Sequence, residues 1–147
     1  MKIIFIITIL FNLVHSRQYR GAELRTVDSF LYGRFDARFK PAQGDGLVSS
    51  FFTYNDDNPN TPWAEIDVEV LGVYSNVVDF NTITRGQTSH IRQHYVDFNP
   101  HLDFHTYSFE WTPEYVAWFI DNIEVYRQTG SHVCLLYTSD AADDRMR

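Results

Sequence analysis

Cysteine is almost absent from this sequence of 147 residues, which has a single cysteine, Cys134. One thiol cannot form an internal disulfide, and it excludes a metal site built from several thiolates. The stability of the fold must therefore come from the burial of apolar surface.

Basic residues are also few, because 12 lysines and arginines stand against 19 aspartates and glutamates, for a net charge of -7. This balance excludes nucleic acid and anionic membrane surfaces as partners, since phosphates need a basic patch. A neutral ligand fits better. Aromatic residues make up 16% of the chain, and their rings can stack on sugars while carboxylates accept hydrogen bonds from hydroxyls, although an aromatic core explains the same composition.

No apolar run is long enough to cross a membrane comfortably, because residues 3–14 fall short of the roughly 20 that a spanning helix needs. This run follows Lys2, and Val14 and Ser16 occupy the positions that signal peptidase reads. The sequence predicts a signal peptide over 1–16 and a secreted, extracellular protein that is free of the membrane after cleavage. An uncleaved anchor or a wrongly assigned start is the alternative.

Helical periodicity is missing too, and from residue 21 onward the chain reads as short strands separated by turn signals. The composition, with 44% hydrophobic residues, favours one folded domain, which we place at 17–130. An Asp-Asn pair at 121–122 is a two-residue connection between antiparallel strands. The fold class is therefore predicted to be all-β, an antiparallel sandwich. The predicted strands are 23–26, 32–39, 47–54, 65–70, 77–84, 94–98, 107–111, 116–120 and 123–126.

The segment 131–147 differs from the rest, because alternation stops and the chain ends in a charged run. Its letters resemble a translated sequencing adapter. We therefore predict a tail that is non-native or disordered and exclude it from functional reasoning.

Three carboxylates, Glu65, Asp67 and Glu69, alternate with the aliphatic residues Ile66 and Val68. On a strand this period places all three acids on one face, where like charges repel one another. The pattern has three interpretations: a solvated face, a calcium site, or a catalytic set. Calcium ligands usually converge from a loop, which a regular strand does not supply. A retaining glycosidase, by contrast, needs one ionised carboxylate and one protonated carboxyl group on either side of a sugar bond.

Distance tests the catalytic interpretation. On a straight strand the Cα atoms of Glu65 and Glu69 lie about 13 Å apart, whereas retention needs carboxyl groups about 5 to 5.5 Å apart. The hypothesis therefore requires a curved sheet with the acids on its concave face.

Residues 63–72, Trp-Ala-Glu-Ile-Asp-Val-Glu-Val-Leu-Gly, preceded by the segment 46–54, resemble the catalytic region of glycoside hydrolase family 16, and most of all its lichenases. The segments 21–26, 80–81 and 105–111 agree with the same family. The similarity spans about 21–128 and implies a curved β-jelly roll.

The resemblance also implies roles for individual residues. Glu65 would be the nucleophile, Glu69 the general acid and then base, and Asp67 an assisting acid. The residues implied to line the sugar cleft are Glu23, Arg25, Phe52, Tyr54, Trp63 and Asn81. By themselves, these six allow plainer interpretations: aromatic core residues, a surface ion pair of Glu23 with Arg25, and a turn residue at 81.

The chain departs from the family pattern in length and in detail. The family's domain has further strands at both ends, so we expect an incomplete jelly roll with unpaired sheet edges and a risk of aggregation, and the activity of this stretch on its own is in question. Thr82 and Ile83 also stand where lichenases have aromatic residues.

Together, these features predict a secreted, monomeric, retaining endo-glycoside hydrolase that acts on a mixed-linkage β-1,3-1,4 or a β-1,3 glucan. No cofactor is expected, although the family's complete domain has a structural calcium site. The alternatives are a transglycosylase on a cell-wall glucan or xyloglucan, a non-catalytic carbohydrate-binding module, and a structural β-domain that binds no sugar.

Overall fold

The computed structural model describes residues 20–55, 62–85 and 88–136, which form two antiparallel sheets and one short 3-10 helix. No helix in this part of the chain has the length and apolar character needed to span a membrane. The elements are β1 (Gly33–Phe39), β2 (Val48–Asn55), β3 (Ala64–Leu71), β4 (Val77–Thr84), β5 (Thr88–Ser89), β6 (Arg92–Tyr95), β7 (His105–Trp111), β8 (Tyr115–Ile120), β9 (Ile123–Thr129) and η1 (Val133–Leu136).

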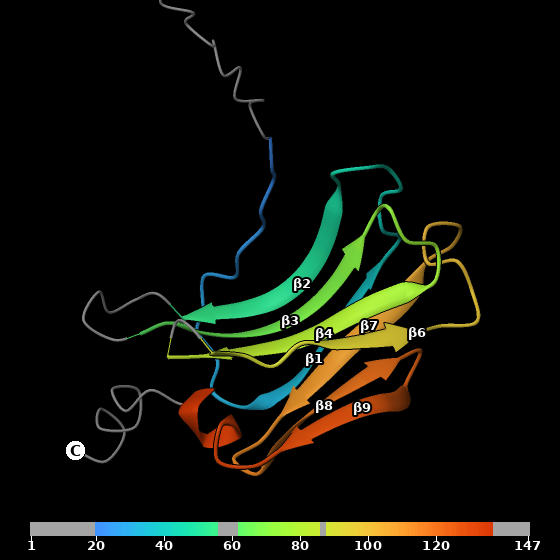
Figure 1. The fold of residues 1–147 in the computed structure, drawn as a ribbon. Helices are drawn as coiled ribbons and strands as arrows, with labels where there is room; N and C mark the ends of the chain where they lie inside the picture. The colour runs from blue at the N-terminus through green and yellow to red at the C-terminus, as the bar shows by residue number, and fades with distance from the viewer. Residues whose placement is uncertain (1–19, 56–61, 86–87, 137–147) are drawn as a thin grey trace, which may run out of the picture.

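The two sheets lie face to face, as Figure 1 shows. One has the strand order β1-β7-β8-β9, and the other has the order β2-β3-β4-β5, with β6 also paired to β4. The first sheet joins strands that are distant in sequence, since β1 pairs with β7. The prediction of an all-β antiparallel sandwich is confirmed.

The core fills the space between the sheets with aliphatic and aromatic side chains. Ile66 and Val68 of β3 and Phe80 of β4 point inward from one sheet, and Phe109 and Trp118 point inward from the other. Because side chains alternate along a strand, the acids of β3 lie on the outer face of their sheet. Figure 1 shows β2 and β3 bending so that this outer face is concave. The curvature that the catalytic hypothesis required is therefore present.

Most predicted strands occur where the alternation placed them. The predicted segment 77–84 has the bounds of β4, whereas the one predicted at 94–98 is found as β6, over Arg92–Tyr95. At the turn between β8 and β9, Asp121 and Asn122 have φ angles of 48° and 68°. Both values lie in the left-handed region that a two-residue hairpin of this type requires.

The predicted strand at 23–26 is wrong. The segment has no strand structure, and the side chain of Leu24 is 99% exposed. A strand is stable only when a neighbouring strand completes its hydrogen bonds, and alternation does not supply that partner. The segment instead lies along the edge of β2 and encloses with it a hollow of about 260 Å³.

The helix η1 extends the ordered structure past the predicted domain boundary at residue 130. Val133 and Leu136 are buried in the core cluster. Val133 and Leu136 therefore pack against the sandwich, although the sequence predicted a non-native or disordered tail from residue 131 onward. The rest of the predicted tail, 137–147, and the predicted signal peptide lie outside the described residues.

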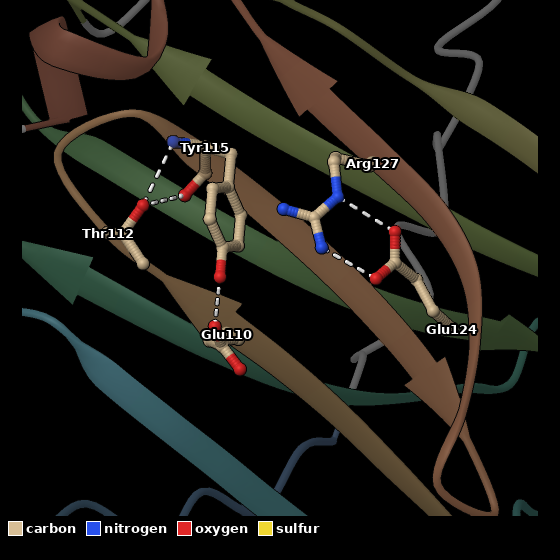
Figure 2. Close-up of polar contacts among 5 residues, drawn as sticks. All are labelled: Glu110, Thr112, Tyr115, Glu124 and Arg127. Carbon is tan, nitrogen blue, oxygen red and sulfur yellow. Dashed lines mark hydrogen bonds and ion pairs between the residues drawn. The ribbon is translucent and has the colours of Figure 1, made fainter.

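The outer face of the β1-β7-β8-β9 sheet carries a network of polar contacts on β7, β8, β9 and the turn between β7 and β8, drawn in Figure 2. Arg127 makes two hydrogen bonds to Glu124, at 2.8 and 2.6 Å, and its guanidinium lies 3.7 Å from the centre of the Tyr115 ring. The hydroxyl of Tyr115 donates to Glu110, and its backbone N–H donates to Thr112 Oγ1 at 3.1 Å. These charges are paired with one another, which distinguishes this face from the acid-bearing face of the other sheet.

Trp118 connects the core to the acid-bearing strand. Its side chain is fully buried, and its indole N–H donates to the backbone carbonyl of Asp67 at 2.9 Å. We predict that Trp118→Phe lowers the free energy of unfolding by about 2 to 3 kcal/mol, because it leaves a void and removes a donor to a buried carbonyl. Urea denaturation measures this change.

Trp111→Phe is the matched control. Trp111 is also buried, but its indole N–H has no hydrogen-bond partner among the described residues. Its replacement should cost about 1 kcal/mol less than that of Trp118, since no hydrogen bond is lost. Equal costs for the two variants would show that the bond to Asp67 adds nothing to stability.

Candidate active site

The three acids of β3 lie in the middle of the concave face. Asp67 is buried, with 4% exposure, and Glu65 and Glu69 on either side of it are half-buried. β2 and β4 pair with β3 on its two edges and place further side chains on the same face. The register gives three rows across the strands: Ser50–Glu69–Asp79, Phe52–Asp67–Asn81 and Tyr54–Glu65–Ile83.

Asn81 is fixed so that its amide nitrogen faces Asp67. The side-chain oxygen of Asn81 accepts hydrogen bonds from Ser89 Oγ at 3.0 Å and from the backbone N–H of His90 at 2.9 Å. Its Nδ2 then donates to Asp67 Oδ2 at 3.2 Å. Asn81 is therefore a central residue of β4 that orients Asp67, and the interpretation as a turn residue is wrong.

The surroundings of Asp67 favour its protonated form. Its burial, the negative charge of Glu65, a hydrogen bond to Glu65 and the charge of Glu69 raise the pKa of Asp67 to about 8, against the opposing hydrogen bond from Asn81. The protonated carboxyl group of Asp67 therefore donates to Glu65. This bond orients the side chain of Glu65, for which the family resemblance implies the role of nucleophile.

Glu69 also favours its protonated form. Burial raises the pKa of Glu69, and the negative charges of Asp79 and Glu65 raise it further. A general acid must be protonated when substrate binds, and so an elevated pKa suits the role that the resemblance implies for this residue.

The acids Glu65, Asp67 and Glu69 form a line along β3, called the acid row below. Aromatic side chains lie at its Glu65 end. Tyr54 faces Glu65 in the register, and the rings of Tyr54 and Trp63 lie 6.4 Å apart. Both residues are more than a third exposed, so Trp63 is available to a ligand and is not a core residue. The guanidinium of Arg25 lies 5.8 Å from the centre of the Tyr54 ring, and Arg25 in turn donates to Glu23.

Phe52, the last of the predicted lining residues, lies opposite Asp67 in the register and is half-buried on the acid-bearing face. The structure therefore brings all six together around the acid row, although Glu23 reaches it only through Arg25. Their roles in sugar binding stay predictions.

Asp79 and Gln93 are residues of this face that the sequence interpretation missed. Asp79 faces Glu69 in the register, is only 9% exposed, and makes a side-chain hydrogen bond with Gln93 of β6. Burial raises the pKa of Asp79, and the bond from Gln93 opposes this rise. Alternation places Asp79 on the same face as Asn81, but its position opposite Glu69 follows only from the register of β4 against β3.

Within 20–55, 62–85 and 88–136, no group of three or more histidine, cysteine, aspartate or glutamate side chains is arranged to hold a metal ion.

The raised pKa of Asp67 predicts how stability depends on pH. A carboxyl group with a pKa of about 8 in the folded state and an ordinary value of 3.8 holds its proton more tightly when folded. The free energy of unfolding should therefore fall as pH rises from about 4 to about 8. Asp67→Asn should flatten this fall and stabilise the fold by at least about 1 kcal/mol at pH 9.

Urea denaturation at pH 5, 7 and 9 tests this prediction. Asp97→Asn, at an exposed position, is the control that changes the net charge equally. A parent protein whose stability rises between pH 5 and pH 9 would contradict the proposed protonation of Asp67.

Comparisons with known proteins identify the family. The profile of "Glycosyl hydrolases family 16" matches residues 9–137. The chain is 43% identical over 114 residues to a "Beta-glucanase" of Acetivibrio thermocellus and 42% identical over 112 residues to a "Xylanase/beta-glucanase" of Ruminococcus flavefaciens. These alignments cover 78% and 76% of this chain.

A solved structure gives the same result. A prokaryotic β-1,3-1,4-glucanase (lichenase) from a mouse hindgut metagenome aligns with a TM-score of 0.67 and 46% identity, over 71% of this chain. The chain spans 49% of that structure, and 34% and 14% of the two curated relatives. It therefore corresponds to part of the length of each.

Proposed function

Since this chain belongs to glycosyl hydrolases family 16, we propose that it carries the catalytic acids of a retaining endo-glycoside hydrolase that cleaves a β-glucan. One observation carries the proposal above all: three carboxyl groups on one bent strand differ in their surroundings, so that Asp67 and Glu69 favour protonation. Adjacent carboxyl groups with different protonation states are what acid-and-nucleophile catalysis needs.

The reaction would proceed in two steps. In the first, Glu69 donates its proton to the leaving glycosidic oxygen while a carboxylate oxygen of Glu65 bonds to the anomeric carbon, which gives a covalent glycosyl-enzyme. In the second, water attacks the same carbon, Glu69 accepts a proton from this water, and the bond to Glu65 breaks. Two displacements on one carbon retain its configuration.

Asp67 would assist both steps through its hydrogen bond to Glu65. In the free enzyme this bond holds the nucleophile in place. When Glu65 forms the ester its charge disappears, and the proton of Asp67 is held less tightly, because the charge of Glu65 is one cause of its retention. The acid row can therefore adjust its protonation as the charge on the nucleophile changes.

The substrate class is proposed from the exposed aromatic residues Tyr54 and Trp63 and from the relatives' names. Tyr54 and Trp63 present exposed rings beside Glu65, which suits stacking on sugar rings. The relatives are called β-glucanases and, for the solved structure, a β-1,3-1,4-glucanase. A mixed-linkage β-1,3-1,4 glucan is therefore the first substrate to test, and a β-1,3 glucan the second.

The experiment is a reducing-sugar assay of the full chain on barley β-glucan, laminarin, xyloglucan and agarose. We expect release of oligosaccharides from barley β-glucan, with retention of anomeric configuration by NMR. Larger products in the presence of an oligosaccharide acceptor would indicate a transglycosylase instead. Binding without cleavage would identify a carbohydrate-binding module, and neither binding nor cleavage would overturn the proposal.

We also propose that the protein is secreted, on the strength of the signal-like pattern at 1–16. Mass spectrometry of the protein from the culture medium should find Arg17 as its first residue. Retention of residues 1–16 would support the uncleaved anchor.

A further inference from the structure

A fourth carboxylate, Asp79, lies opposite Glu69 where β4 pairs with β3. The residue is only 9% exposed. One carboxylate oxygen, Oδ1, is buried and accepts no hydrogen bond from the residues that the structure describes. A buried carboxylate with an unpaired oxygen is unfavourable, and this placement calls for an explanation.

Stability does not explain it. Residues directly opposite on antiparallel strands have Cβ atoms about 4.5 to 5.5 Å apart, and like charges at this distance are destabilising. A neutral side chain or a base opposite Glu69 would give a more stable sheet. The arrangement therefore suggests a use for the repulsion.

The groups that face Glu69 can be named strand by strand. β3 itself contributes Asp67 and Glu65, and β2 contributes the neutral Ser50. β4 contributes Asp79, which is the charged neighbour of Glu69 across the strands. β6 adds the neutral Gln93 and, further along, Tyr95, while Arg25 lies over Tyr54 at the opposite end of the row.

Gln93 bears on which of the two facing carboxyl groups, Asp79 or Glu69, is protonated. Its hydrogen bond to Asp79 favours the ionised form of that carboxylate, whereas the charge of Asp79 favours the protonated form of Glu69. Burial raises the pKa of both carboxyl groups, but only for Asp79 is a hydrogen bond among the causes that oppose the rise. The bond from Gln93 therefore favours the charge on Asp79 and the proton on Glu69.

We propose that Asp79 is a positioning residue for Glu69: its buried carboxylate, directly opposite Glu69 across the β3–β4 pair, favours the protonated form of the general acid in the free enzyme. This inference rests on the proposed function for the catalytic role of Glu69, but the pairing itself does not. The same charge strengthens Glu69 as a base in the second step, when it must take a proton from water. One neighbour thus serves both steps.

The test is the pH dependence of kcat/KM on the glucan for Asp79→Asn, which keeps the shape and removes the charge. The limb of the profile on the alkaline side should move to lower pH by about one unit, because Glu69 then loses its proton earlier. Asp79→Ser, which is neutral and smaller, should move it in the same direction. Asp97→Asn, exposed and away from this face, should leave it unchanged.

A second measurement separates this inference from the proposed function. The carboxyl carbon of Glu69, followed by NMR during a pH titration, should report a pKa that falls in Asp79→Asn and in Asp79→Ser, whether or not the chain hydrolyses a glucan. The Asp97→Asn protein should titrate like the parent. A Glu69 titration that is the same with and without the charge at position 79 would overturn the inference.

Discussion

Replacement of Glu65 by glutamine should lower turnover of the glucan by at least about 10⁴-fold, the largest effect expected of any single change in this chain. The amide has nearly the same shape as the carboxylate, but it is neutral and cannot form the glycosyl-enzyme. Oligosaccharide binding should remain measurable, because Tyr54 and Trp63 beside this position are unchanged. Stopped assays of product formation and calorimetric titration with an oligosaccharide measure the two quantities.

Glu114→Gln is the matched control for this substitution. It makes the same chemical change at an exposed position between β7 and β8, and it should hydrolyse the glucan at the parental rate. A Glu65→Gln protein with parental turnover would refute the assignment of the nucleophile. Parental turnover would also leave the curved acid row without a catalytic explanation.

Glu69→Gln should lower hydrolysis of the polysaccharide by about 10² to 10⁴-fold, the usual contribution of a general acid or base. The loss should depend on the leaving group, which is the diagnostic feature. The phenolate of an aryl glycoside with an acidic phenol leaves without protonation. The first step on such a substrate should therefore proceed at nearly the parental rate. Azide, a nucleophile that needs no base, should then restore turnover and give a glycosyl azide of retained configuration.

This pattern separates a general acid from a residue that merely supports the fold. The Glu69→Gln protein should also lose the alkaline limb of its pH profile, because the group that titrates there is gone. A variant that loses activity equally on the polysaccharide and on the aryl glycoside, without rescue by azide, would point to a structural or binding role for Glu69.

The strands were predictable because their pattern is local. Alternation placed Glu65, Asp67 and Glu69 on one face with Ile66 and Val68 on the other, and the structure has β3 there with its aliphatic residues in the core. The two-residue turn at Asp121 and Asn122 was equally local. Where a strand needs a distant partner, alternation was insufficient, and the segment 23–26 is not a strand.

Cross-strand neighbours were not predictable in the same way. Asn81 lies beside Asp67 because β4 pairs with β3 in one particular register, and a slip of one residue would turn it to the other face. Asp79 was overlooked for this reason, since its importance arises only from its position opposite Glu69. The burial of Val133 and Leu136 likewise depends on the completed sandwich, not on their own segment.

By itself, the sequence determined which side chains share a face, since the two-residue period of a strand follows from the geometry of the backbone alone. It also contains the motif of family 16 around residues 63–72. Only the tertiary structure decided the bend of the sheet, the depth at which Asp67 is buried, and which acid faces which. The pKa of a carboxyl group depends on its solvation and on charges a few ångströms away, and the chain brings those neighbours together only when it folds.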